Sequence, residues 1–98
     1  MGHLFYKGAE GPLDIEDRTL AHLRLVFMTK LRRGEPFLFI TTSPHGNAPR
    51  EFWIHPSLPL QFRFVGSRLP QINPRWIDVL MDSANSSAGL HVIREPSG

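Results

Sequence analysis

The sequence predicts an α+β fold, a mostly antiparallel sheet with two helices on one face, in the order ββαβββαβ. Three observations lead to this prediction. Apolar residues recur at helical spacing over residues 18–33 and 74–85, while the other apolar segments are short or alternate with period two. Glycine and proline separate these segments. The 98 residues, 41% of them hydrophobic, suit a single domain spanning residues 1–98.

The chain is expected to begin with a hairpin and then enter its first helix. Residues 4–6 and the alternating stretch 12–16 are typical of strands, and the glycines between them allow a turn. Asp17 is the expected N-cap, because its carboxylate can accept hydrogen bonds from free amides of the first turn. The helix is expected over 18–33, with Gly34 ending it in a left-handed conformation.

The first helix has one apolar stripe and one polar face. The expected buried stripe consists of Leu20, Leu23, Phe27, Met28 and Leu31. The expected opposite face carries Arg18, His22, Thr29 and Arg33. Arg24 falls inside the apolar stripe, which leaves two interpretations. Its long side chain reaches the edge of the core or meets a carboxylate, or its guanidinium points into a ligand groove.

The second half of the chain predicts an antiparallel meander, a helix and a last strand. The meander uses residues 37–41, 51–55 and 60–65, with alternate residues of the last segment facing inward. Asn73 followed by proline predicts the start of a helix over 74–85. A final strand is expected at 90–94. The sheet face opposite the helices must be polar, paired with another copy, or used for binding.

Basic residues are concentrated in the middle of the chain. The net charge is +2, but residues 18–75 hold nine basic and two acidic side chains, a net charge of +7. If folding gathers these bases, the domain binds nucleic acid weakly and without sequence preference; otherwise they form a solvated surface. With four phosphates neutralised, log K would fall with log salt at a slope of roughly −3.6. The expected nucleic-acid-binding residues are Lys30, Arg32, Arg33, Arg50, Arg63 and Arg68.

Catalytic, metal and membrane signals are weak in this sequence. The chain has no cysteine, and its five histidines include no pair at the spacing of a helical metal site. Ser43, His45 and Asn47 share a loop rich in proline and glycine, which does not hold a nucleophile and its base rigidly. We therefore expect a non-catalytic protein with no metal or cofactor. No apolar run is long enough to cross a bilayer, so we expect a cytoplasmic protein with no membrane partner.

Seven short segments spread over the chain carry a family resemblance. They are DRTLAHL (17–23), KLRRGE (30–35), WIHP (53–56), PLQFRF (59–64), NPRWI (73–77), SANS (83–86) and GL (89–90). On these segments the chain resembles a family of small actinobacterial proteins, a domain of unknown function whose members often carry the label "ATP-dependent DNA ligase". The resemblance covers nearly the whole chain and implies an association with DNA metabolism.

The residues that a ligase needs for adenylation are not in the sequence. Such an enzyme takes up adenylate on a lysine in a Lys-x-Asp-Gly motif, whereas Lys7 is followed by Gly-Ala and Lys30 by Leu-Arg-Arg. Two functions are therefore expected. The first is a DNA-metabolism accessory domain that binds nucleic acid weakly. The alternative is a protein-interaction or self-associating module, such as a homodimer, that uses the open face or an edge of the sheet.

Overall fold

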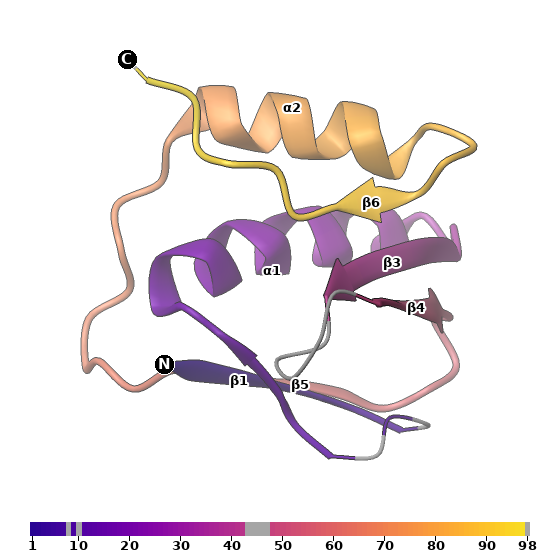
Figure 1. Ribbon diagram of the computed structural model, residues 1–98, viewed down its shortest axis with the longest axis horizontal. Helices are drawn as coiled ribbons and strands as arrows, with labels where there is room; N and C mark the ends of the chain where they lie inside the picture. Colours follow the sequence, from indigo (N-terminus) through magenta and orange to yellow (C-terminus); the bar gives the residue numbers. More distant parts are fainter. Residues whose placement is uncertain (8, 10, 43–47, 98) are drawn as a thin grey trace.

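Within the described residues, two helices and six strands follow one another in the predicted order, which confirms the α+β class (Figure 1). The computed structural model describes residues 1–7, 9, 11–42 and 48–97. The strands are β1 (Gly2–Tyr6), β2 (Leu13–Ile15), β3 (Phe37–Thr42), β4 (Pro49–Ile54), β5 (Leu60–Arg63) and β6 (Leu90–His91). The helices are α1 (Asp17–Arg32) and α2 (Pro74–Ala84).

The six strands are divided between two three-stranded sheets. One sheet has the order β2-β1-β5 and is antiparallel. The other has the order β4-β3-β6, in which β3 pairs antiparallel with β4 and parallel with β6. The predicted meander from β3 to β5 is therefore wrong in its last step. Pro56 and Pro59 interrupt the chain after β4, and β5 leaves that sheet to pair with β1.

The side chain of Phe27 joins α1 to both sheets. It is fully buried, and its ring lies edge-on to Phe37 and Phe39 of β3, with centroids 4.9 and 5.1 Å away. A third edge-on contact, at 5.8 Å, reaches Phe62 of β5 in the other sheet. Edge-to-face pairs at these separations add to the stabilisation that comes from burial alone. One residue of α1 therefore lies where the two sheets meet.

The buried surface of α1 is wider than the predicted stripe. Leu20, Leu23 and Phe27 are fully buried as expected, whereas Met28 and Leu31 are only half-buried. The prediction that His22 lies on a polar face is wrong, because this residue is fully buried. The reason is that α2 packs against a second side of α1 (Figure 1).

Arg24 is half-buried on α1. Among the residues that the structure describes, no hydrogen bond or ion pair joins Arg24 to another residue. The described part of the chain therefore offers Arg24 no carboxylate partner. Its half-buried state fits the interpretation of a long side chain that reaches the edge of the core.

His22 connects α1 to the start of α2. Its Nε2 lies 2.9 Å from the backbone nitrogen of Asn73, and its Nδ1 lies 2.7 Å from the carbonyl oxygen of Arg18. Because the Asn73 amide can only donate, Nε2 accepts that hydrogen bond and Nδ1 donates to Arg18. The ring also packs against Trp76 with centroids 4.4 Å apart. This arrangement requires the neutral ring with its proton on Nδ1.

The two helix starts differ in how far they follow the sequence prediction. Asn73 is the N-cap of α2 as predicted, and its Oδ1 accepts from the Arg75 amide at 3.1 Å. Asp17 is not an N-cap; it is the first residue of α1, and Glu16 precedes it without a capping hydrogen bond. The Asp17 carboxylate instead accepts from the amides of Gly66 (2.9 Å) and Val65 (3.1 Å), and these bonds lower its pKa. This contact fixes the chain that leaves β5.

We expect His22→Ala to lower the free energy of unfolding by about 2–4 kcal/mol. The substitution opens a cavity beside Trp76 and leaves the Asn73 amide without its acceptor. Urea unfolding followed by circular dichroism measures the change as a lower midpoint at an unchanged m-value. His55→Ala, in an exposed turn, is the control and should change the free energy by less than about 0.5 kcal/mol. Equal effects of the two substitutions would contradict the role of His22.

Candidate functional site

The residues predicted to bind nucleic acid do not form one surface. Lys30 is buried, and its Nζ is held by Asn85 Oδ1 at 2.8 Å and Glu35 Oε1 at 3.1 Å. These bonds tie the last turn of α1 to the end of α2. Lys30 is thus a structural residue, and its ammonium group is already neutralised by an acidic partner.

The five arginines predicted alongside Lys30 lie in three separate places. Arg32 and Arg33 are exposed at the C-terminal end of α1. Arg63 and Arg68 are exposed near its N-terminal end, since the intervening Gly66 contacts Asp17. The 16 residues of α1 separate these two pairs by about 24 Å.

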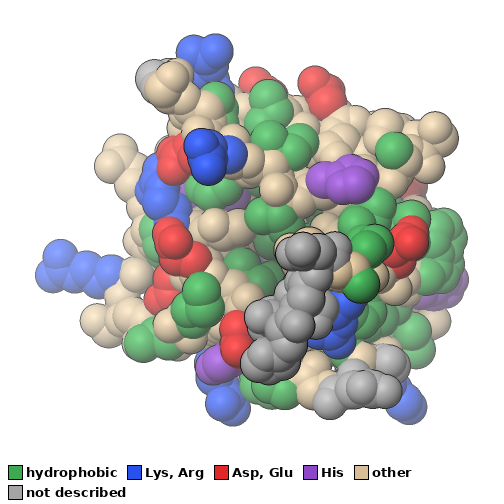
Figure 2. Space-filling model, in the orientation of Figure 1, with side chains coloured by type: hydrophobic (Ala, Val, Ile, Leu, Met, Phe, Trp, Pro, Cys, Tyr) green, Lys and Arg blue, Asp and Glu red, His purple; other side chains and the backbone are tan. Residues whose placement is uncertain are grey.

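Arg50 occupies the third place, on β4, where its guanidinium lies 5.2 Å from the centre of the Phe52 ring. Arg63 makes a similar contact with Phe5 at 5.0 Å. Both guanidinium groups thus have a cation–π partner within the domain. Figure 2 shows Lys and Arg side chains at separated positions on the visible side of the molecule, with acidic and hydrophobic groups between them.

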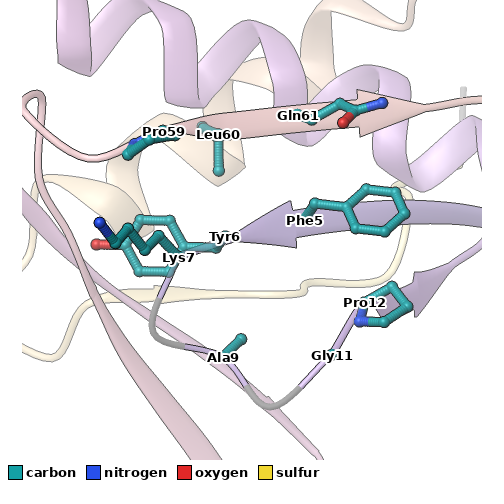
Figure 3. Close-up of a pocket in the computed structure, with 9 residues that line it drawn as sticks. All are labelled: Phe5, Tyr6, Lys7, Ala9, Gly11, Pro12, Pro59, Leu60 and Gln61. Atoms are coloured by element: carbon teal, nitrogen blue, oxygen red, sulfur yellow. The ribbon is translucent and has the colours of Figure 1, made fainter.

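A hollow of about 470 Å³ lies between the β1–β2 hairpin and the start of β5 (Figure 3). Its lining is mainly apolar, and the polar side chains among the described residues are Tyr6, Lys7 and Gln61. The Tyr6 hydroxyl is already used, because it donates to the carbonyl oxygen of Trp53 in the other sheet. Neither an acid–base pair nor a nucleophile with its base lines this hollow in the described part of the chain.

Histidine and acidic side chains do not gather into a metal site. Among the residues described, no group of three or more His, Asp or Glu side chains is placed to hold an ion. His55 Nδ1 lies 2.8 Å from Ser57 Oγ, but it also accepts from the Ser57 amide, so the pair closes an exposed turn. Ser43, His45 and Asn47 lie outside the described residues. Neither α1 nor α2 is long and apolar enough to span a membrane.

The outer face of the β4-β3-β6 sheet is the strongest candidate for a functional surface. In β3, Phe37 and Phe39 point into the core, so the alternating residues point outward. We define the outer face by five residues from three strands: Leu38, Ile40, Glu51, Trp53 and His91. Trp53 is 58% exposed. An exposed indole beside two half-buried aliphatic side chains is typical of an interaction surface.

Figure 2 shows this sheet face in the right-hand half of the view, where hydrophobic, acidic and histidine side chains lie close together. Two hollows of about 280 Å³ each border it. One lies beside Trp53 and Gly89, and the other beside Ile40 and His91. The outer face is therefore uneven, with raised and recessed parts.

Sequence reasoning missed Trp53 as an exposed residue. The centre of the segment 51–55 is strongly apolar, which favours burial. The signal that could have shown this is the alternation of the strand. Trp53 shares its side of the strand with Glu51, whereas its sequence neighbours Phe52 and Ile54 share the other side. A tryptophan in phase with a glutamate indicates an outward position.

The edges of both sheets are poor sites for pairing with another strand. On the β4 edge, Pro49 has no amide proton, and the Trp53 carbonyl already accepts from Tyr6. On the β6 edge, the His91 amide donates to Ser83 Oγ at 3.0 Å. The remaining edge strands, β2 and β5, have three and four residues. Contact with a partner is thus favoured through the outer face and not through an edge.

A second polar site surrounds the Glu95 carboxylate. Arg18 donates to it with Nε at 2.8 Å and Nη2 at 2.6 Å, and Asn73 Nδ2 donates at 2.8 Å. The hydrogen bonds from Arg18, and to a smaller extent the one from Asn73, lower the pKa of Glu95 from 4.5 to about 2. The hydrogen bonds to Glu95 in turn raise the pKa of Arg18. The site lies in a groove of about 670 Å³ between α1 and the N-terminal end of α2.

We expect Glu95→Gln to flatten the acid dependence of stability. The lowered pKa means that the Glu95 contribution is fully present above pH 4.5 and is lost as the pH falls toward 2. Unfolding by urea at several pH values between 6 and 2 should show a smaller fall for the variant than for the wild type. Asp17 still contributes to the acid limb, so the fall is reduced and not abolished. Asp78→Asn, on the exposed side of α2, is the control. Parallel curves for wild type and Glu95→Gln would contradict the assignment.

Comparisons with known proteins give one family and no individual relative. Neither the curated proteins nor the solved structures contain a significant match to the chain. A family model described as a domain of unknown function, DUF7882, matches residues 1–95. Because this match spans almost all of the 98 residues, the chain belongs to the DUF7882 family.

Proposed function

We propose that the domain is a non-catalytic, self-associating module whose outer face stacks on the outer face of a second copy. The observation that carries this proposal is the 58% exposed Trp53 beside half-buried Leu38 and Ile40 on the outer face of the sheet. Removing such a surface from water is favourable, and stacked sheets of two copies bury it at a separation of about 10 Å.

The outer face is self-complementary in its register. Glu51, Ile40 and His91 lie in one row across β4, β3 and β6. In the neighbouring row Trp53 of β4 pairs with Leu38 of β3. Gly89, which immediately precedes β6, continues this row on the other side of β3. A two-fold axis parallel to β3 exchanges β4 with β6 between the two copies. It therefore places Glu51 over His91 of the second copy, and Trp53 over Gly89 of the second copy.

The position opposite Trp53 in that arrangement is recessed because Gly89 has no side chain. A Cβ at Gly89 would lie 3.0 Å from both Cβ and the carbonyl oxygen of Leu38, and the φ of +91° is unfavourable for other residues. The hollow of about 280 Å³ beside Gly89 is thus maintained by both packing and backbone conformation. A large indole facing a recess supports stacking of one copy on another.

The self-association should be weak. Five side chains per copy make a smaller interface than the roughly 800 Å² per partner of stable complexes. We therefore expect a dissociation constant between about 10 µM and 1 mM. Sedimentation velocity over this concentration range should show a reversible shift from monomer to dimer.

Substitutions at the outer face test the proposal directly. Trp53→Ala should weaken dimerisation at least tenfold, because it removes the largest exposed apolar group of the face. Leu69→Ala is the matched control, since Leu69 is 60% exposed but lies in the segment between β5 and α2. Glu51→Lys should also weaken the dimer, and Glu51→Lys combined with His91→Glu should restore it. A monomer at every concentration, or equal effects of Trp53→Ala and Leu69→Ala, would contradict the proposal.

Nucleic-acid binding in DNA metabolism has less support from the arrangement of charges. Each exposed pair, Arg32 with Arg33 or Arg63 with Arg68, can neutralise two phosphates at one place. We therefore expect duplex DNA to bind with a salt slope of about −1.8, not the −3.6 of a four-phosphate site. Fluorescence anisotropy between 20 and 200 mM salt measures the slope. A steeper slope, abolished by charge reversal at Arg32 and Arg33, would favour the nucleic-acid function over self-association.

A further inference from the structure

The Glu95 carboxylate occupies a site that is built by other parts of the chain. Its three donor groups in the described part of the chain belong to Arg18 on α1 and to Asn73 at the start of α2. The two nitrogens of Arg18 bind one carboxylate oxygen each, which is the side-on geometry that guanidinium groups adopt with carboxylates. Arg18 and Asn73 thus surround Glu95 as a receptor surrounds a carboxylate ligand.

The donors are held in place independently of Glu95. Arg18 Nη1 donates to the carbonyl oxygen of Gln71 at 2.8 Å, which orients the guanidinium. Asn73 is oriented twice, because its Oδ1 accepts from the Arg75 amide and its backbone amide donates to the buried His22. The Asn73 amide group must therefore present its Nδ2 toward the groove. A site with such supports keeps its shape when its occupant leaves.

The segment that carries Glu95 is anchored by few side-chain hydrogen bonds. Residues 92–97 follow β6 and have no regular secondary structure. Apart from those of Glu95, the side-chain hydrogen bonds that join this segment to the described residues are Trp76 Nε1 to the Ile93 carbonyl at 2.8 Å and Asn73 Nδ2 to the Pro96 carbonyl at 3.5 Å. Ile93 also packs, partly buried, against the hydrophobic core. Segments at a chain end with no regular secondary structure and few hydrogen bonds open at a lower free energy than the core does.

We propose that Arg18 and Asn73 form a carboxylate-binding site that Glu95 occupies from within the chain, and that the carboxylate side chain of an acidic peptide can replace it. The ligand class follows from the donors. Among the described residues Arg18 is the one charged donor to Glu95, and it supplies a single positive charge with two parallel N–H groups, which match a planar monoanion. Displacement of Glu95 would release residues 92–97 from the groove. This site is separate from the outer face of the proposed function.

The experiment removes the internal carboxylate and offers an external one. Glu95→Ala is labelled with ¹⁵N and titrated with sodium acetate and with N-acetyl-glutamate amide, while the Arg18 Nε–H and Asn73 side-chain signals are followed by NMR. Sodium chloride at equal ionic strength is the reference, and inorganic phosphate distinguishes a carboxylate site from a general anion site. We expect saturable shifts with both carboxylates, at concentrations at least tenfold lower than in the wild type, where tethered Glu95 competes.

Two further variants keep the result decisive. Arg18→Ala combined with Glu95→Ala should show no saturable shift of the Asn73 signal, since the guanidinium is absent. Glu95→Gln retains the size of the side chain and serves in place of Glu95→Ala if that variant does not fold. The proposal is overturned if a folded Glu95 variant shows no saturable carboxylate response, if the Arg18 double variant responds equally, or if phosphate binds more tightly than either carboxylate.

Discussion

The edge-on packing of Phe27 against three other phenylalanine rings is the contact on which the architecture depends. Neither sheet has more than three strands, and each needs a partner to bury its inner face. Phe27 provides that partner to both, through Phe39 in one sheet and Phe62 in the other. The Tyr6 hydroxyl on the Trp53 carbonyl adds a polar link between the sheets at another place. The outer face stays open because α1 covers only the inner side of the β4-β3-β6 sheet.

The second helix is fixed by polar contacts as much as by apolar ones. Its buried residues Trp76 and Leu80 contribute to the core, but its start is set by the hydrogen bond from the Asn73 amide to His22. The same Asn73 binds Glu95, which in turn binds Arg18 one helical turn before His22. Four side chains from three segments therefore form one continuous network. A network whose members are all satisfied favours a single geometry, and no described buried side-chain nitrogen or oxygen lacks a partner.

Much of the fold follows from patterns within single segments, and what does not follow depends on pairing between distant segments. Periodicity predicts both helices, and Asn73 and Gly34 are predicted as helix ends because their roles are local. The division into two sheets could not be predicted, since no local pattern states that β5 pairs with β1. Burial of His22 depends on where α2 docks, which is again a tertiary effect. Among the expected site residues, the burial of Lys30 could not be predicted, because one of its two partners, Asn85, lies 55 residues away in the sequence.

The two sheets also determine how the chain must come together in time. Pairing of His3 with Arg63 closes one sheet across 60 residues, and pairing of Phe39 with Leu90 closes the other across 51. Each closure loses loop entropy before its contacts form, which slows folding relative to helical domains of similar length. Until β6 adds to β3, the side chain of Leu90, which is fully buried in the folded domain, stays exposed to solvent. Rapid collapse of helices α1 and α2 around His22 and Trp76 would shield part of this surface, so the order of docking governs how long the unfinished chain is prone to aggregate.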